Sequence, residues 1–134
     1  VAVDELHDAA GAYDAADNTV KYIWDRDNVL PEERLGVIIH EMWHRRQAYD
    51  AVREGWTITH ENKSAYIAWL AEKCRKRMER LGVTNFEQAA KISEYAGGMF
   101  LISRFDEIEA EFEMKDALES AAMQRRIKRE RRFE

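Results

Sequence analysis

Two histidines and a glutamate stand together in the segment "GVIIHEMWHRRQ", residues 36–47. His40 and His44 are four residues apart, so on a helix they share one face and can present two imidazole nitrogens to a single metal ion. Glu41 lies about 100° around the helix axis from His40, which suits a base that reaches a water molecule on that ion better than it suits a ligand. Two ligands and one base on a single helix are what a hydrolytic zinc centre needs.

The residues around this pair are apolar. The run "LGVIIHEMWH" is apolar around nearly the whole helix, which predicts that the two histidines are buried or half-buried. A buried histidine pair requires compensating partners. The alternative to a metal ion is that both imidazoles hydrogen-bond to carboxylates in a polar core.

A zinc site with an open position needs a third protein ligand, and the last expected helix offers carboxylates. Steps of 100° along "RFDEIEAEFEMKDALESAA" place Glu107 and Glu111 within a stripe of small and apolar residues. The other members of the stripe are Ala110, Met114, Leu118 and Ala121. Carboxylates on a packing face require positive charge nearby, which zinc on the two histidines would supply. We therefore predict Glu107 as the third ligand and Glu111 as a hydrogen-bond partner for the far nitrogen of a ligating histidine.

Two alternatives to this ligand set stay open. Glu109 and Glu113 fall on other faces of the helix and are expected to be solvated, and the whole acidic run could be a solvated face. His60, in "WTITHENK", follows His44 by 16 residues and is the competing third ligand. If it is not a ligand, His60 is expected to be an exposed residue near a helix start.

The elements that must position these side chains are mostly helices. Expected helices span residues 31–54, 62–81 and 84–103, with a short one at 4–10 and a last long one from about Asp106. Gly55 and Gly82 are the expected helix stops. Thr84 with Glu87, and Asp106 with Glu109, have the spacing of reciprocal helix caps.

The only strong β signal precedes the first long helix. In "GAYDAADNTVKYIW", the turn-rich residues 14–18 separate Gly11 and Tyr13 from a segment in which Val20, Tyr22 and Trp24 share one face. This pattern predicts a small hairpin. The expected fold class is therefore α+β, mostly helical, with a hairpin packed on the helix of the histidine pair.

Composition limits the class of protein. The chain has 134 residues, of which 46% are hydrophobic and 35% charged, and we expect one domain over residues 1–134. No apolar run approaches the ~20 residues of a membrane-spanning helix. The net charge of −5 disfavours general nucleic-acid binding. The single cysteine, Cys74, is expected to be a partly buried thiol and suits a reducing compartment.

The N-terminal segment "VAVDELHDAAGAYD" has no long apolar run and no initiator Met. We therefore expect that the segment is not a signal peptide and that the protein is located in the cytoplasm or in a virion. We also expect that the chain is a trimmed domain of something longer or a processed product.

On these residues the chain resembles the gluzincin type of zincin metallopeptidase. In that family one helix bears two histidines and a glutamate base, and a later helix gives a glutamate ligand. The matching residues are His40, Glu41 and His44 in "HEMWH" and Glu107 in "DEIEAEFE". "GAYDAADNTVKYI" is similar to small bacterial and phage peptidase domains, in which a G-x-Y hairpin holds an extended substrate. The chain is also similar to HExxH domains of phage minor head proteins in the segments "HEMWHRRQAYD", "ISEYA" and "RFDEIEAE".

The resemblance implies peptide hydrolysis with Zn²⁺ held by His40, His44 and Glu107 and a peptide or protein as substrate. Glu41 would take a proton from water and pass it to the leaving amine, and the strand at residues 20–24 would pair with the substrate backbone.

The chain also departs from the pattern. It has no xxGxxH continuation, which disfavours the metzincin branch, and no asparagine precedes the last-helix glutamate. The residue that stabilises the oxyanion is not identified by the sequence; Tyr66, Tyr95 and Arg104 are the candidates.

The C-terminal segment "MQRRIKRERRFE" has six positive and two negative residues. It is expected to be a solvated helix end, with contact to nucleic acid or a capsid as the alternative.

Two other functions stay open for the whole chain. One is a non-catalytic assembly module with structural zinc, and the other is a metal-free helical interaction domain.

Overall fold

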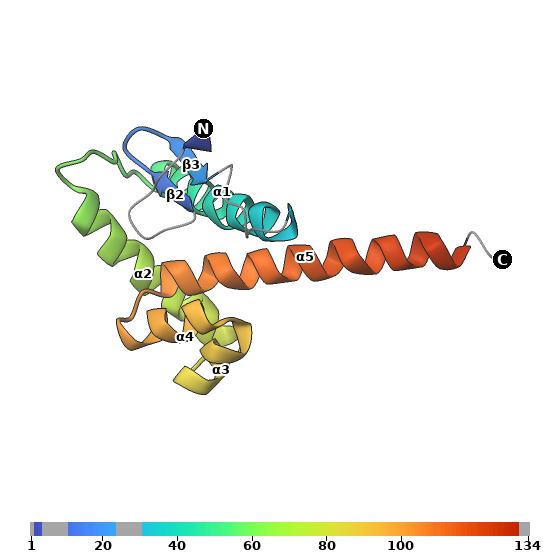
Figure 1. The fold of residues 1–134 in the computed structure, drawn as a ribbon. Coiled ribbons are helices and arrows are strands. Elements are labelled where there is room, and N and C mark those ends of the chain that lie inside the picture. The colour runs from blue at the N-terminus through green and yellow to red at the C-terminus, as the bar shows by residue number, and fades with distance from the viewer. Residues whose placement is uncertain (1, 4–10, 24–30, 132–134) are drawn as a thin grey trace.

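A computed structural model describes residues 2–3, 11–23 and 31–131. The described residues form three strands and five helices: β1 (Ala2–Val3), β2 (Gly11–Asp14), β3 (Thr19–Ile23), α1 (Pro31–Arg53), α2 (Lys63–Arg80), α3 (Phe86–Ile92), α4 (Glu94–Leu101) and α5 (Phe105–Arg131). The mostly helical fold with a hairpin on the first helix is confirmed (Figure 1). The short helix expected at residues 4–10 and the expected strand residue Trp24 lie outside the described part.

β2 and β3 form the predicted antiparallel hairpin, with Gly11 opposite Tyr22 and Asp14 opposite Thr19. The Asp14 carboxylate accepts hydrogen bonds from two backbone N–H groups of the turn, and Asn18 has a positive φ of 51°. β1 pairs in parallel with the other side of β3, so the sheet order is β1-β3-β2. β2 is therefore an edge strand among the described residues.

The hairpin lies directly on α1 because Gly11 has no side chain. A Cβ at Gly11 would overlap Cγ1 of Val37 and lie 3.2 Å from Cγ of Glu41. This close approach brings the edge strand β2 beside the α1 residues predicted to do chemistry.

Both predicted glycine stops are confirmed. Gly55 and Gly82 have φ values of +105° and +90°, the left-handed conformation that glycine adopts most readily. After α2, the N–H of Val83 donates to the carbonyl of Met78 and the N–H of Gly82 to that of Glu79, which is a Schellman motif. After α1, the N–H of Trp56 donates in the same way to the carbonyl of Ala51.

The prediction of one continuous helix over residues 84–103 is wrong, because the chain forms two helices there, α3 and α4, which are separated at Ser93. Ser93 has extended backbone angles, φ −167° and ψ 160°, and its side chain accepts from the N–H of Ala96 to cap α4. A serine can offer this cap wherever the chain leaves the helix, so helix propensity alone does not locate the break. The cap of α3 also lies one residue later than expected, because Asn85 rather than Thr84 accepts from the N–H of Gln88.

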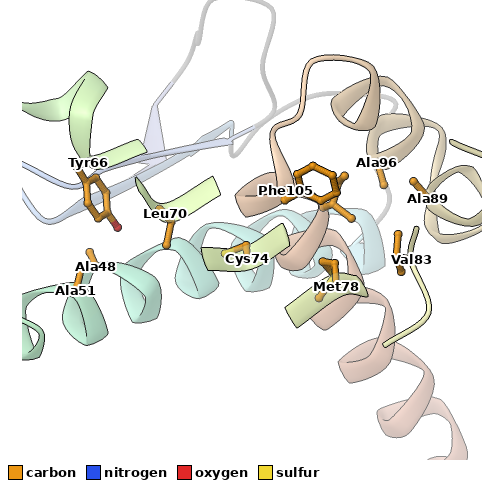
Figure 2. Packing of buried hydrophobic residues seen from close by; sticks show 11 residues of the cluster. Ala48, Ala51, Tyr66, Leu70, Cys74, Met78, Val83, Ala89, Ala96 and Phe105 are labelled. Atoms are coloured by element: carbon orange, nitrogen blue, oxygen red, sulfur yellow. The ribbon is translucent and has the colours of Figure 1, made fainter. Parts of the chain in front are cut away.

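The apolar core joins all five helices (Figure 2). Its buried residues are Ala48, Ala51, Tyr66, Leu70, Cys74, Met78, Val83, Ala89, Ala96, Phe105 and Ile108. On α2, Tyr66, Leu70 and Met78 are buried, and the thiol of Cys74, expected to be partly buried, is buried as well.

α5 has two different halves. Its first half packs against α1, α2 and α4, whereas its second half extends beyond the other elements (Figure 1). The arginines and lysine of the basic segment up to Arg131 are exposed there. None of the described helices is both long enough and apolar enough to cross a membrane.

Candidate metal centre

The structure brings three of the predicted site residues to one point between α1 and α5. Nε2 of His40 and Nε2 of His44 each lie 2.9 Å from the same oxygen of Glu107, and the two nitrogens are 3.1 Å apart. The two rings pack edge to face, with centroids 4.9 Å apart. The stripe of small and apolar residues on α5, which led to the prediction of Glu107, does face α1. A Cβ at Gly36 would lie 3.2 Å from Sδ of Met114 and 3.4 Å from Cδ1 of Leu118.

This donor set fits a zinc ion. Bonds of about 2.0–2.1 Å in a tetrahedral site separate neighbouring ligand atoms by about 3.3 Å. The three separations here are 2.9, 2.9 and 3.1 Å, so the side chains need to open by only a few tenths of an ångström. Two imidazoles and one carboxylate are also ligands that zinc accepts in open sites.

His60 lies elsewhere. Its Nε2 is 3.2 Å from a carboxylate oxygen of Asp17 on the hairpin turn, and its side chain is 64% exposed. The structure groups it with Asp14 and Asp17 and not with the two α1 histidines. The structure thus favours Glu107 over His60 as the third member of the cluster.

The far nitrogen of His40 has the partner that the helical phase predicted. Nδ1 of His40 lies 2.8 Å from Oε2 of Glu111, one turn after Glu107 on α5. The other oxygen of Glu111 accepts from the hydroxyl of Ser93 at 2.7 Å. The break between α3 and α4 therefore holds the carboxylate that orients His40.

The far nitrogen of His44 contacts a residue that the sequence reasoning missed. Nδ1 of His44 lies 2.7 Å from Oε1 of Gln47, and the amide nitrogen of Gln47 lies 3.1 Å from a carboxylate oxygen of Glu109. The signal was present in the sequence, because Gln47 follows His44 by three residues and shares its helix face.

The expectation that Glu109 is solvated is wrong. Glu109 is only 6% exposed and accepts a hydrogen bond of 2.6 Å from the indole N–H of Trp43. Nη1 of Arg77 on α2 lies 3.4 Å from its other oxygen. The helical phase predicted a single packing face on α5. Because α1, α2 and α4 all cover α5, the face that bears Glu109 is buried too. The expected Asp106–Glu109 cap is also absent from the described contacts, since Asp106 pairs with Arg104.

Glu41 lies beside the triad without joining it. Its side chain is buried, and one carboxylate oxygen is 3.9 Å from Nε2 of His40. Burial raises the pKa of Glu41, and the nearby His44 and His40 oppose that effect only in part. A carboxylate with a raised pKa is better matched to proton transfer near neutral pH than an exposed one.

Contacts within the cluster raise the pKa of His40 and lower the pKa of Glu107. Burial disfavours the charged form of His40, but its contacts with Glu107 and Glu111 outweigh this and raise its pKa to about 10. Burial would likewise raise the pKa of Glu107, but the bonds to both histidines hold that pKa well below its usual range. Without a metal, protons on the imidazoles neutralise the carboxylates.

A cavity of about 270 Å³ opens beside the cluster. Glu41, His44 and Glu107 line it, together with Gly11, Ala12, Tyr13, Ala15, Gln47, Lys63, Tyr66, Ile67, Leu70, Tyr95, Arg104 and Asp106. The edge strand that borders this cavity is β2. The expectation that the strand at residues 20–24 pairs with the substrate backbone is therefore corrected, because β3 lies between β1 and β2 and both of its edges are already paired.

The three residues considered for stabilising the oxyanion, Tyr66, Tyr95 and Arg104, all line this cavity, but they differ in exposure and in their contacts. Arg104 donates two hydrogen bonds to Asp106 and lies 3.4 Å from Glu107. Tyr66 is buried and packs against Trp56. Tyr95 is 46% exposed, and its ring lies edge-on to His40 with centroids 5.8 Å apart. Burial and the neighbouring Glu107 raise the pKa of Tyr95, which keeps its hydroxyl protonated.

Comparison of the chain with protein-family models, with curated proteins and with solved structures gives no match. The class of site is accordingly defined by its geometry: a buried His–His–Glu group on two helices that could hold a metal ion.

Proposed function

We propose that this chain is a zinc-dependent peptidase domain of gluzincin type, with His40, His44 and Glu107 as ligands and Glu41 as general base. One observation supports this most. The far nitrogens of both imidazoles face acceptors, Glu111 and Gln47, while the near nitrogens meet a single carboxylate oxygen. Neutral imidazoles with their protons on the far nitrogens would direct two lone pairs and a carboxylate at one point. Such a point requires a cation.

The residues around that point have separate roles. Zinc held there would act as a Lewis acid toward a peptide carbonyl and would lower the pKa of water. Glu41 takes the proton from the attacking water oxygen as the new C–O bond forms. It returns a proton to the amide nitrogen as the C–N bond breaks, so that the products are a carboxylate and an amine. The hydroxyl of Tyr95, half-exposed beside Glu107, is the favoured donor to the oxyanion.

The substrate proposed for this site is an extended peptide segment. β2 is an edge strand in the described part of the chain and borders the cavity with Gly11, Ala12 and Tyr13. An edge strand offers backbone N–H and C=O groups to an added strand. A peptide paired there would run past Glu41 and the histidine pair.

The test is Glu41→Gln in the full chain, with Glu119→Gln as its control. Glutamine has the size and polarity of glutamate but accepts no proton at neutral pH, so peptide hydrolysis should fall by about 10²–10⁴-fold. Glu41 has no assigned bond to the metal, so the variant should still bind about one zinc per chain. Glu119 is exposed on α5, and its variant should match the parent in both measurements.

Two results would count against the proposal. Parent protein that gains neither zinc in elemental analysis nor thermal stability on zinc addition has no such site, because a ligand that prefers the folded state must stabilise it. Zinc binding with no hydrolysis of any peptide library in the parent would instead favour the assembly module with structural zinc.

A further inference from the structure

We propose that Gln47 and Glu109 form a hydrogen-bonded relay that fixes the ring of His44, with a proton on Nδ1 and with Nε2 directed at Glu107. Where it concerns zinc affinity, this inference rests on the proposed metal site. The relay runs from α1 to α5 and comprises residues outside the ligand set. His44 Nδ1 to Gln47 Oε1 is 2.7 Å, and Gln47 Nε2 to Glu109 Oε1 is 3.1 Å.

The orientation of the Gln47 amide follows from its neighbours. One end of the amide lies 3.1 Å from the backbone carbonyl oxygen of Asp106 and 3.1 Å from the carboxylate of Glu109. Both of these groups only accept hydrogen bonds, so the amide nitrogen must face them. Its Oε1 is then left to face His44, and because a carbonyl oxygen cannot donate, Nδ1 of His44 must carry the proton.

Two further side chains, Trp43 on α1 and Arg77 on α2, hold Glu109 in place. The indole N–H of Trp43 donates to the same oxygen that Gln47 contacts, at 2.6 Å, and Arg77 lies 3.4 Å from the other oxygen. Both Gln47 and Glu109 are buried, at 5% and 6% exposure. A buried carboxylate with these partners stays in one position, so the amide that it orients stays in one position as well.

The two imidazoles of the cluster therefore have chemically different supports. His40 donates to a carboxylate, Glu111, whereas His44 donates to a neutral amide. With a metal ion at the centre, each imidazole would be neutral, with its proton on Nδ1 and the lone pair of Nε2 facing that ion. Without the relay, the ring of His44 could rotate or place its proton on Nε2, and that nitrogen could not bind a metal.

The experiment compares three full-length proteins: the parent, Gln47→Met and Gln124→Met. Methionine matches the length of glutamine but has no amide, and Gln124 is an exposed control on α5. Nitrogen-15 spectra of labelled histidines report which ring nitrogen carries the proton, and a zinc titration reports the Kd. Loss of a partner outside the ligand set typically weakens metal binding about 10–100-fold.

We expect a slowly exchanging Nδ1 proton on His44 in the parent and in Gln124→Met, and its loss in Gln47→Met with a 10–100-fold weaker Kd for zinc. The proposal is overturned if Nδ1 of His44 in the parent carries no proton or binds zinc, a result that needs no folded variant. It is also overturned if Gln47→Met retains both the protected proton and the parent Kd. If the parent binds no zinc, the peptidase proposal fails, and the Nδ1 proton of the metal-free protein still decides for or against the relay.

Discussion

At the scale of single residues, Glu107 is the side chain on which both imidazoles converge. Glu107→Ala should lower zinc affinity by more than about 100-fold, because loss of a direct ligand costs more than loss of a supporting partner. Isothermal titration with zinc, after removal of metal by a chelator, measures the change.

Glu119→Ala is the matched control for that variant. It removes the same charge from the same helix, and Glu119 is exposed. Glu109→Ala is not a suitable control, although it appears so from the sequence, because Glu109 is buried against Trp43 and Gln47. Equal zinc affinity in Glu107→Ala and Glu119→Ala would show that the ligand lies elsewhere.

Much of the cluster could be predicted from helical phase alone. The i, i+4 spacing identified the histidine pair, and the stripe on α5 identified Glu107 and Glu111. Glu109 was assigned wrongly because two helices cover it: Trp43 and Gln47 approach it from α1, and Arg77 approaches it from α2. The phase of residues along α5 alone contains no information about these contacts with other helices.

At the scale of elements, the position of β2 depends on a single glycine. Gly11→Ala should destabilise the protein by about 1–3 kcal/mol, because its methyl group would overlap Val37 and press on Glu41. If β2 moves to relieve this contact, hydrolysis should fall as well. Denaturant unfolding and a peptide-cleavage assay measure the two effects.

Gly98→Ala provides the control for this change. Gly98 lies inside α4, and a Cβ there meets no atom within 4 Å. Alanine should therefore stabilise the helix by about 0.5–1 kcal/mol. If Gly11→Ala behaved in the same way, the close contact between the hairpin and α1 would be of no consequence for stability.

Helix positions were predictable where local signals are strong, and the break at Ser93 shows where they are not. The glycine stops after α1 and α2 depend on backbone conformation that few other residues adopt, so the sequence locates them. Ser93 caps α4 and also donates to Glu111, a residue 18 positions away. That second contact is tertiary, and no local pattern reports it.

At the scale of the whole molecule, stability without metal should depend on pH through the cluster. His40 has a pKa of about 10 when folded and an ordinary value of 6.5, so its contribution is complete below pH 6.5 and is lost as pH rises toward 10. Glu107 has a lowered pKa, so its contribution is present above its ordinary value of 4.5 and is lost in acid. Thermal melts of chelator-treated protein should be highest between about pH 4.5 and 6.5 as far as this cluster is concerned.

Zinc should reverse the alkaline part of that profile. Its ligands must be deprotonated, so the rise in melting temperature on zinc addition should be larger at pH 8 than at pH 6. A metal-independent rise in stability from pH 6.5 to 9 would contradict the imidazolium–carboxylate cluster.

The contact between His40 and Glu107 also has a consequence for how the chain folds. It joins positions 67 residues apart, and α2, α3 and α4 lie inside the loop that it closes. Loop closure costs chain entropy before the contact returns any stability, so local helices should form first and the two ends of the loop should meet late. In stopped-flow experiments on metal-free protein, Glu107→Ala should then speed unfolding and leave the folding rate nearly unchanged, whereas a slower folding rate would place this contact in the transition state.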